Sequence, residues 1–142
     1  MTTRTFDLTR VAVTFRGLPI SGFVEGDAVE ITFSENLYNK SVGADGSVSR
    51  AAVNNVTAEV AFNLQSTSPA NATFQDAYAA DRADGSGWGA LLIEDTLGSF
   101  RFFAAESWIM KVPDLTLGTE TPSVTWTLDT GQVDPSFIGI SA

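Results

Sequence analysis

The sequence predicts a mainly β domain, a sandwich or barrel with one packed α-helix, and three observations support this prediction. Most of the 142 residues lie in runs that alternate between apolar and polar side chains, which is typical of half-buried strands. Only one segment has helical spacing. Apolar residues make up 44% of the chain and cysteine is absent, so we expect residues 1–142 to form a single domain around a hydrophobic core.

Regular alternation predicts four strands. It is clearest at residues 55–65, where every second side chain is apolar and the side chains between them are small or polar. Shorter runs of the same kind lie at residues 10–16, 27–34 and 123–129. Successive side chains of a strand point to opposite faces, so each run should have a core face and a polar face.

Two further apolar runs, at residues 90–93 and 100–110, alternate less regularly than the four predicted strands. Residues 96–99, which lie between them, include several turn formers. We therefore expect these runs to form a hairpin, and we expect its strands to be buried on both faces.

One segment carries the signals of a helix. Ser68 and Pro69 are typical of the N-cap and of the first helical position, and residues 72–83 have apolar side chains at helical spacing. Asp84-Gly85 follows and should end the helix. This helix is expected to pack on the strands.

A long segment, at about residues 35–52, separates two of the predicted strands. Its centre contains Asp45-Gly46, a strong signal for a tight turn between two strands. We interpret the segment as an extended hairpin arm, which is longer than a sandwich requires and is available for contact with another molecule. The alternative is an ordinary protruding surface loop.

The chain has no histidine and no cysteine, so it lacks the usual base of a serine nucleophile, the thiolate nucleophile and the common zinc ligands. Carboxylate pairs could still hydrolyse glycosides, but no motif places two of them across a cleft. Residues 85–90 match a dinucleotide-binding pattern with its flanking elements reversed, and residues 81–85 fail the calcium-loop pattern. We expect no catalytic, cofactor-binding or metal-ligating residues, no cofactor and no enzyme activity.

The net charge is −9, from 8 basic and 17 acidic side chains. Such a protein repels phosphate on average, so it is not expected to bind nucleic acid through counterion release. No run of about 18 apolar residues is present and the first residues lack an apolar signal region, so we expect no membrane partner and no secretion. The simplest interpretation of the acidity is that it keeps the monomer soluble.

Three stretches are rich in turn residues: Ile20-Ser21-Gly22-Phe23 with Gly26-Asp27, then Val42-Gly43-Ala44-Asp45-Gly46-Ser47-Val48-Ser49-Arg50, then Thr67-Ser68-Pro69-Ala70-Asn71. Together they resemble a family of phage structural proteins related to the tail tubes of contractile-tailed phages. The Gly-Ala-Asp-Gly run is the most characteristic part. The resemblance extends from about Val11 to about Leu128, which is nearly the whole chain.

This resemblance implies a tail-tube-like sandwich in which one sheet of each subunit joins a continuous barrel. It implies hexameric rings that stack into a tube in the virion tail, through which genome DNA is ejected without specific binding. The implied partners are further copies of the chain, the tail sheath protein if the tail contracts, and the tape-measure protein. Assembly would take place in the host cytoplasm, with which the absence of cysteine agrees.

Two sets of residues follow as hypotheses from the implied tube. Lysine or arginine on a channel wall would hold phosphates, so acidic and hydroxyl-bearing strand faces are expected to line the channel. The alternative is that these faces are the solvated outside of the sandwich. The channel-lining set is Glu30, Thr32, Ser34, Thr57, Glu59, Ala61 and Asn63. The arm is expected to reach the neighbouring ring through Lys40, Ser41, Val42, Gly43, Ala44, Asp45, Gly46, Ser47, Val48, Ser49 and Arg50.

Two other functions fit the same sequence. One is a tube or head decoration protein of a related particle, such as a secretion-system tube. The other is an acidic β-sandwich module that binds carbohydrate or protein, with Trp88, Trp108 or Trp126 as a stacking platform. Trp108 and Trp126 lie in strongly apolar strands, which favours core positions for both.

Overall fold

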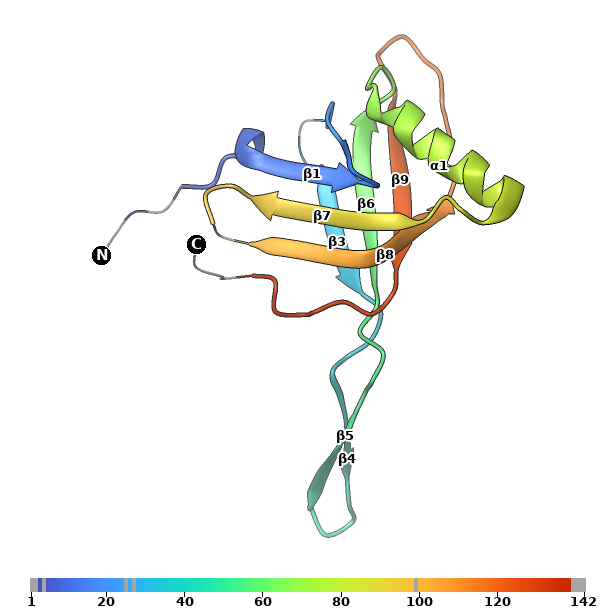
Figure 1. Ribbon diagram of the computed structural model, residues 1–142. Coiled ribbons are helices and arrows are strands. Elements are labelled where there is room, and N and C mark those ends of the chain that lie inside the picture. The colour runs from blue at the N-terminus through green and yellow to red at the C-terminus, as the bar shows by residue number, and fades with distance from the viewer. Residues whose placement is uncertain (1–2, 4, 25, 27, 99, 139–142) are drawn as a thin grey trace.

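The computed structural model describes residues 3, 5–24, 26, 28–98 and 100–138, and it has a mainly β fold with one α-helix and a projecting hairpin (Figure 1). This confirms the fold class predicted from the sequence, and the four alternating runs are present as strands. In chain order the elements are a 3₁₀ helix (Leu8–Arg10), β1 (Val11–Phe15), β2 (Leu18–Pro19), β3 (Val29–Phe33), β4 (Tyr38–Val42), β5 (Val48–Ala52), β6 (Ala58–Gln65), α1 (Ala70–Asp84), β7 (Gly89–Asp95), β8 (Arg101–Lys111) and β9 (Ser123–Thr130).

Seven strands form one antiparallel sheet in the order β2-β1-β7-β8-β9-β6-β3, and β4 pairs with β5 in a separate hairpin. The sheet folds over on itself into two layers. Figure 1 shows β1, β7 and the first part of β8 running steeply across β3, β6 and β9. The hydrophobic core lies between the layers, as in a sandwich or a half-open barrel.

β8 belongs to both layers. Its first half pairs with β7 and its second half pairs with β9. The register of β8 shifts against both β7 and β9. The adjacent residues Ala105 and Glu106 are both exposed, so the alternation of buried and exposed side chains changes phase in the middle of β8. A bulge of this kind bends a strand and increases its twist, which turns the sheet from one layer into the other. The buried positions of β8 are Phe102, Ala104, Ser107 and Ile109.

Phe74 of α1 contacts both layers from a fully buried position. The centroid of its ring lies 5.7 Å from that of Phe15 in β1. On the other layer, the same ring lies 5.6 Å from Phe62 in β6 and 5.5 Å from Trp126 in β9. Aromatic pairs at such separations are favourable beyond the area that they bury, so Phe74 anchors α1 across one end of the sandwich.

α1 occupies the predicted helical segment, although it begins two residues earlier, at Ala70. The Oγ atom of Ser68 accepts a hydrogen bond from the amide of Ala70 at 3.2 Å and donates one to the carbonyl of Ser21. Pro69 takes the N-cap position itself rather than the first helical position. The helix ends where Gly85 adopts a left-handed conformation with φ of 77°, as the Asp-Gly signal predicted.

The hairpin predicted from the two apolar runs is present as β7 and β8, but the prediction that it is buried on both faces is wrong. Burial alternates along β7, and Phe103 and Met110 in β8 are 49% and 44% exposed. The sequence hides this alternation because outward-facing positions such as Leu92 and Phe103 are themselves apolar. Polarity alone therefore does not distinguish the two faces of this hairpin.

Phe74→Ala should lower the free energy of unfolding by about 3–5 kcal/mol, because it empties a site that joins the two layers. Urea denaturation followed by tryptophan fluorescence measures this loss. The matched control Phe103→Ala removes the same atoms from a side chain that is 49% exposed, and should cost about 1 kcal/mol or less. Equal losses in the two variants would contradict the placement of the core.

Candidate functional site

The outer side of the layer formed by β3, β6 and β9 carries small, polar and acidic side chains, and we call it the polar face. Along each strand these side chains alternate with more deeply buried apolar ones. Three members are acidic, and none is lysine or arginine. The members are Glu30, Thr32, Ser34, Thr57, Glu59, Ala61, Asn63, Gln65, Ser123, Thr125, Thr127 and Asp129.

All seven residues of the predicted channel-lining set lie on the polar face. The pairing of β3 with β6 places Thr32 directly opposite Glu59. Just outside these strands, the hydroxyl of Thr57 donates a hydrogen bond to that of Ser34 at 3.1 Å. The structure therefore brings the set together on one surface, although the arm separates its two halves in the sequence.

β9 adds side chains to the polar face that the sequence prediction did not include. Its pairing with β6 places Asp129 opposite Glu59 and Thr125 opposite Asn63. The hydroxyl of Thr125 donates a hydrogen bond to the side-chain oxygen of Asn63. The alternation at residues 123–129 was visible in the sequence, but the identity of the strand beside it was not.

The polar face carries three acidic side chains, and Lys111 of β8 lies at its border, opposite Thr127 and paired with Asp114. Glu59 and Asp129 face each other across two strands, an arrangement of like charges that weakens a sheet. Within the described part of the chain, neither these two carboxylates nor that of Glu30 forms an ion pair. The face therefore has a negative potential that repels anions such as phosphate.

Two open edges border the layer that carries the polar face. β3 pairs only with β6 among the described strands, so its other edge is free. At the opposite border, the pairing of β8 with β7 ends at Ser107 and Gly89, and β8 continues alone on that side to Lys111. Both edges present backbone amides and carbonyls that can pair with another strand.

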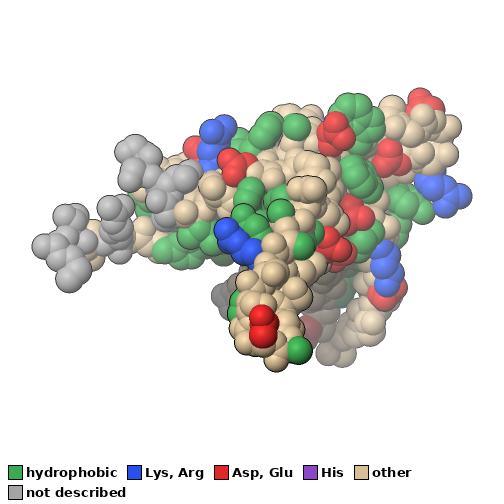
Figure 2. Space-filling view, turned by 90° about the horizontal axis from the view of Figure 1, so that it is seen from below, with side chains coloured by type: hydrophobic (Ala, Val, Ile, Leu, Met, Phe, Trp, Pro, Cys, Tyr) green, Lys and Arg blue, Asp and Glu red, His purple; other side chains and the backbone are tan. Residues whose placement is uncertain are grey.

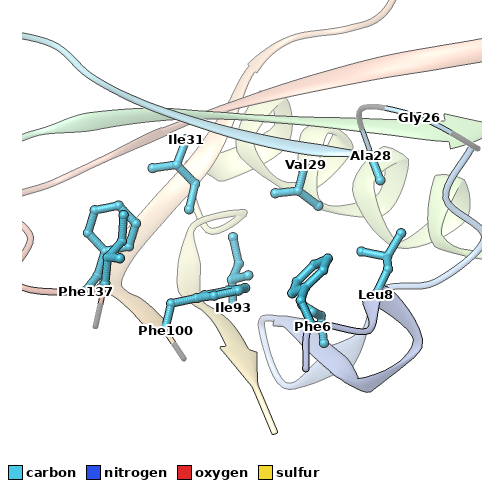
Figure 3. A pocket seen from close by; sticks show the side chains of 11 residues that line it. Phe6, Leu8, Gly26, Ala28, Val29, Ile31, Ile93, Phe100 and Phe137 are labelled. Atoms are coloured by element: carbon cyan, nitrogen blue, oxygen red, sulfur yellow. The ribbon is translucent and has the colours of Figure 1, made fainter. Parts of the chain in front are cut away.

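An apolar groove of about 510 Å³ lies beside β3. Figure 3 shows Val29 and Ile31 of β3 on one side of it, with Phe100 and Phe137 on the other and Phe6 at its far end. These side chains belong to the end of the sandwich that α1 does not close. The groove is therefore a part of the core that remains open to solvent in the single chain.

The arm is a hairpin of β4 and β5 that projects away from the body, as Figure 1 shows from the side and Figure 2 shows from below. The predicted hairpin is thus confirmed. All residues of both strands are exposed. Register places Val42 opposite Val48 near the tip and Lys40 opposite Arg50 in the middle. The predicted inter-ring set, Lys40 to Arg50, makes up the outer part of this arm.

Asp45 organises the turn at the tip of the arm. Its carboxylate accepts hydrogen bonds from the hydroxyl of Ser47 at 2.7 Å and from the amide of Ser47 at 3.0 Å. The hydroxyl, followed by the amide, lowers the pKa of Asp45 below the ordinary value of 3.8. Gly46 has φ of 86°, a left-handed conformation that glycine adopts without strain.

The three tryptophans differ in exposure. Trp126 is 3% exposed and Trp108 is half-buried, whereas Trp88 is 54% exposed. The expected core position is therefore confirmed for Trp126, and Trp108 lies only partly in the core. Among the described residues, no group of three or more potential ligands could hold a metal ion, and no helix is long and apolar enough to cross a membrane.

Comparison with known proteins identifies a family and a shared fold. The family model described as "Bacteriophage PhiTE tail tube protein" matches residues 4–138. No curated protein matches the chain. The cap that terminates the tube of the anti-feeding prophage is similar in structure, with a TM-score of 0.66 and 12% identity, over 94% of this chain and 92% of that chain. The sheath/tube terminator of the extracellular contractile injection system PVC, in its extended state, has a TM-score of 0.68 and 10% identity, over 94% of this chain and 98% of that chain.

The turn of the arm should loosen only in acid. Because the pKa of Asp45 is lowered in the folded arm, its stabilising effect is complete above 3.8 and is lost as pH falls through the lower, folded value. The amide shift of Ser47, followed by NMR, should therefore be constant from pH 7 to pH 5 and change below 3.8. In the control variant Asp45→Asn this titration should disappear. A midpoint above 3.8 in the unmodified chain would contradict the bonded carboxylate.

Proposed function

Because the chain belongs to the Bacteriophage PhiTE tail tube protein family, whose members are structural tail components and not enzymes, we propose that it is a tail tube subunit. In this proposal residues 1–142 form a single domain, copies of the chain form hexameric rings, and the rings stack around a channel for genome DNA. Family membership favours this function over the alternative that the chain is a module that binds carbohydrate or protein. It assigns the chain to the phage tail, and assembly in the host cytoplasm is part of the proposal.

The polar face carries the proposal, and we assign it to the channel wall. DNA that slides through a tube must not adhere to it, and each lysine or arginine on the wall would hold a phosphate by releasing its counterions. On β3, β6 and β9 the polar face offers Glu30, Glu59 and Asp129 among hydroxyls and small side chains, and no basic residue. Lys111 lies at its β8 border, where Asp114 pairs with it. Its negative potential keeps the phosphates away from the surface.

The open edges of β3 and β8 would close the ring. The layer from β8 through β9 and β6 to β3 has an even number of antiparallel strands. If β3 of one copy lies beside the free part of β8 of the next, the two strands run in opposite directions and extend the antiparallel order around the ring. Such closure satisfies the edge groups that a lone sandwich would expose, and it covers the apolar groove beside β3.

The arm would connect one ring to the next through Lys40 to Arg50. The hairpin extends beyond the body, and its side chains are exposed in the single chain (Figure 1). Because its strands and turn are formed in the single chain, little backbone freedom is lost when it docks. The proposed partners are further copies of the chain, the sheath protein if the tail contracts, the tape-measure protein, and DNA that passes without specific binding.

A tube terminator is the second candidate function. Two solved structures with this fold are a tube-terminating cap and a sheath/tube terminator, each similar over 94% of this chain. In this role a single ring of the chain would end a tube. Electron microscopy of the purified protein separates the two functions. Long hollow tubes would support a tube subunit, isolated rings would support a terminator, and monomers at all concentrations would contradict both.

Replacing both Glu30 and Glu59 by lysine should leave tube assembly intact and slow or block genome ejection. The reason is that two basic side chains in each subunit would give the channel wall rings of phosphate-binding sites. DNA release from particles built with the variant measures the effect, and added salt should partly restore release because it screens these contacts.

Two controls accompany this variant. Replacing the same two residues by glutamine removes charge without adding phosphate sites, and should slow release less. Glu120→Lys adds a basic side chain outside the polar face and should not change release. Normal DNA ejection from particles with the double lysine variant would contradict an electrostatic role of the polar face.

A further inference from the structure

A second pocket lies where the end of α1 meets β8, at the β8 border of the polar face, where Trp108 is paired with Asp129. It is separate from the apolar groove. It has a volume of about 330 Å³, and Asp81, Trp88, Glu106 and Trp108 line it. We call it the tryptophan pocket. Trp88 follows α1 and is 54% exposed, so its indole is accessible to another molecule.

The lining of this pocket has the chemistry that recognises a cation. Indole faces attract guanidinium and ammonium groups through the ring quadrupole, and carboxylates beside them add direct ionic contacts. Asp81 lies in the last turn of α1, where the helix dipole favours positive charge. The nearest basic residue of the helix, Arg82, instead contacts Tyr78 through its hydroxyl at 3.2 Å.

Within the described part of the chain, no lysine or arginine forms an ion pair with Asp81 or Glu106. The ion pairs present there join Arg101 to Glu94 and Lys111 to Asp114. The Oδ1 atom of Asp81 accepts a hydrogen bond from the amide of Gly87 at 2.8 Å, so Glu106 is the more accessible of the two carboxylates to a basic group from another molecule.

The basic groups of the arm form no ion pair with any residue that the structure describes. Lys40 and Arg50 face each other across the hairpin, and like charges in this arrangement are unfavourable unless an anion lies nearby. The guanidinium of Arg50 lies 4.0 Å from the ring centre of Tyr38, which holds it flat on one face of the arm. An arginine presented in this way can stack on a further aromatic ring.

We infer that the tryptophan pocket receives the arm of a second copy of this chain. Figure 1 shows the arm extending away from the end of α1, so the arm that fills the pocket belongs to another copy. Arg50 stacks on the indoles, and the two cations of the arm, Lys40 and Arg50, balance the two carboxylates of the pocket. This inference rests on the proposed function, because it requires copies of the chain to assemble.

Charge complementarity favours the arm of a second copy over a nucleic acid as the occupant of the tryptophan pocket. The pocket carries two carboxylates and would repel a phosphate backbone, whereas it attracts a basic hairpin. The apolar tip of the arm, formed by Val42 and Val48, remains free to pack on the surface around the pocket.

Charge reversal on both sides of the contact tests the inference. Arg50→Glu and Glu106→Lys, each alone, should raise the protein concentration needed for assembly by about tenfold or more. The chain with both changes should assemble within about threefold of the unmodified concentration, because the ion pair is restored in the opposite sense. Light scattering and electron microscopy measure this. A double variant no better than the worse single variant would overturn the inference.

Matched controls separate this contact from general charge effects. Glu120→Lys makes the same charge change as Glu106→Lys outside the pocket, and it should assemble normally and fail to rescue Arg50→Glu. Circular dichroism of each variant confirms that the fold is retained. Rescue by Glu120→Lys would mean that net charge, and not the pocket, governs assembly.

Cross-linking gives a second measurement that does not depend on a loss of assembly. The natural chain has no cysteine, so Arg50→Cys with Glu106→Cys introduces one reactive pair. Oxidation of the assembled variant should give covalent multimers on a non-reducing gel, whereas Arg50→Cys with Glu120→Cys should give only monomers. Multimers from the control pair alone would overturn the inference.

The proposed function and this inference can fail separately. If the unmodified chain remains monomeric at all concentrations, the proposed function fails and the inference fails with it. If the unmodified chain forms tubes or rings, and the Glu106→Lys and Trp88→Ala variants do so at the same concentration, only the receptor assignment fails.

Discussion

A sheet of seven strands can enclose a core only if it bends, and here the bend lies within β8. One half of β8 pairs with β7 and the other half with β9, and the phase of burial shifts by one residue at Ala105 and Glu106. Without this shift, one half of the strand would turn its exposed side chains into the core. The layer of β3, β6 and β9 can therefore bury its apolar side chains against β1 and β7 while its other side remains polar. The shift also frees the last residues of β8 from β7, and so creates one of the two open edges.

The two ends of the sandwich are closed in different ways. At one end, Phe74 contacts aromatic rings of both layers, and α1 covers the core. At the other end α1 does not cover the core, and the apolar groove beside β3, with Leu8 of the 3₁₀ helix in its lining, is open. A protein that functions as a monomer usually covers such a groove, because exposed apolar surface promotes association. The groove lies beside the open edge of β3, so a neighbouring copy that paired with this edge would cover both.

Like charges lie side by side in two parts of the molecule. Glu59 and Asp129 are neighbours on the polar face, and Lys40 and Arg50 are neighbours on the arm. Each pair places like charges side by side, which weakens the isolated sheet or hairpin. The two arrangements are opposite in sign and lie on different parts of the molecule. The proposed channel wall and the proposed contact of the arm with an acidic pocket both require this separation.

The sequence by itself determined the features that depend on neighbouring residues. Period-two alternation predicted β1, β3, β6 and β9, the Ser-Pro start and Asp-Gly end predicted α1, and Asp45-Gly46 predicted the turn of the arm. Because alternation defines the two faces of a strand, the sequence also predicted that Glu30, Thr32 and Glu59 lie on one surface. Only the tertiary structure decided that Asp129 joins them, that β8 bends, and that Asp81 and Glu106 share a pocket with two tryptophans. These features depend on pairings between segments far apart in the chain, and local side-chain patterns specify which face of a strand is buried without specifying which strand lies beside it.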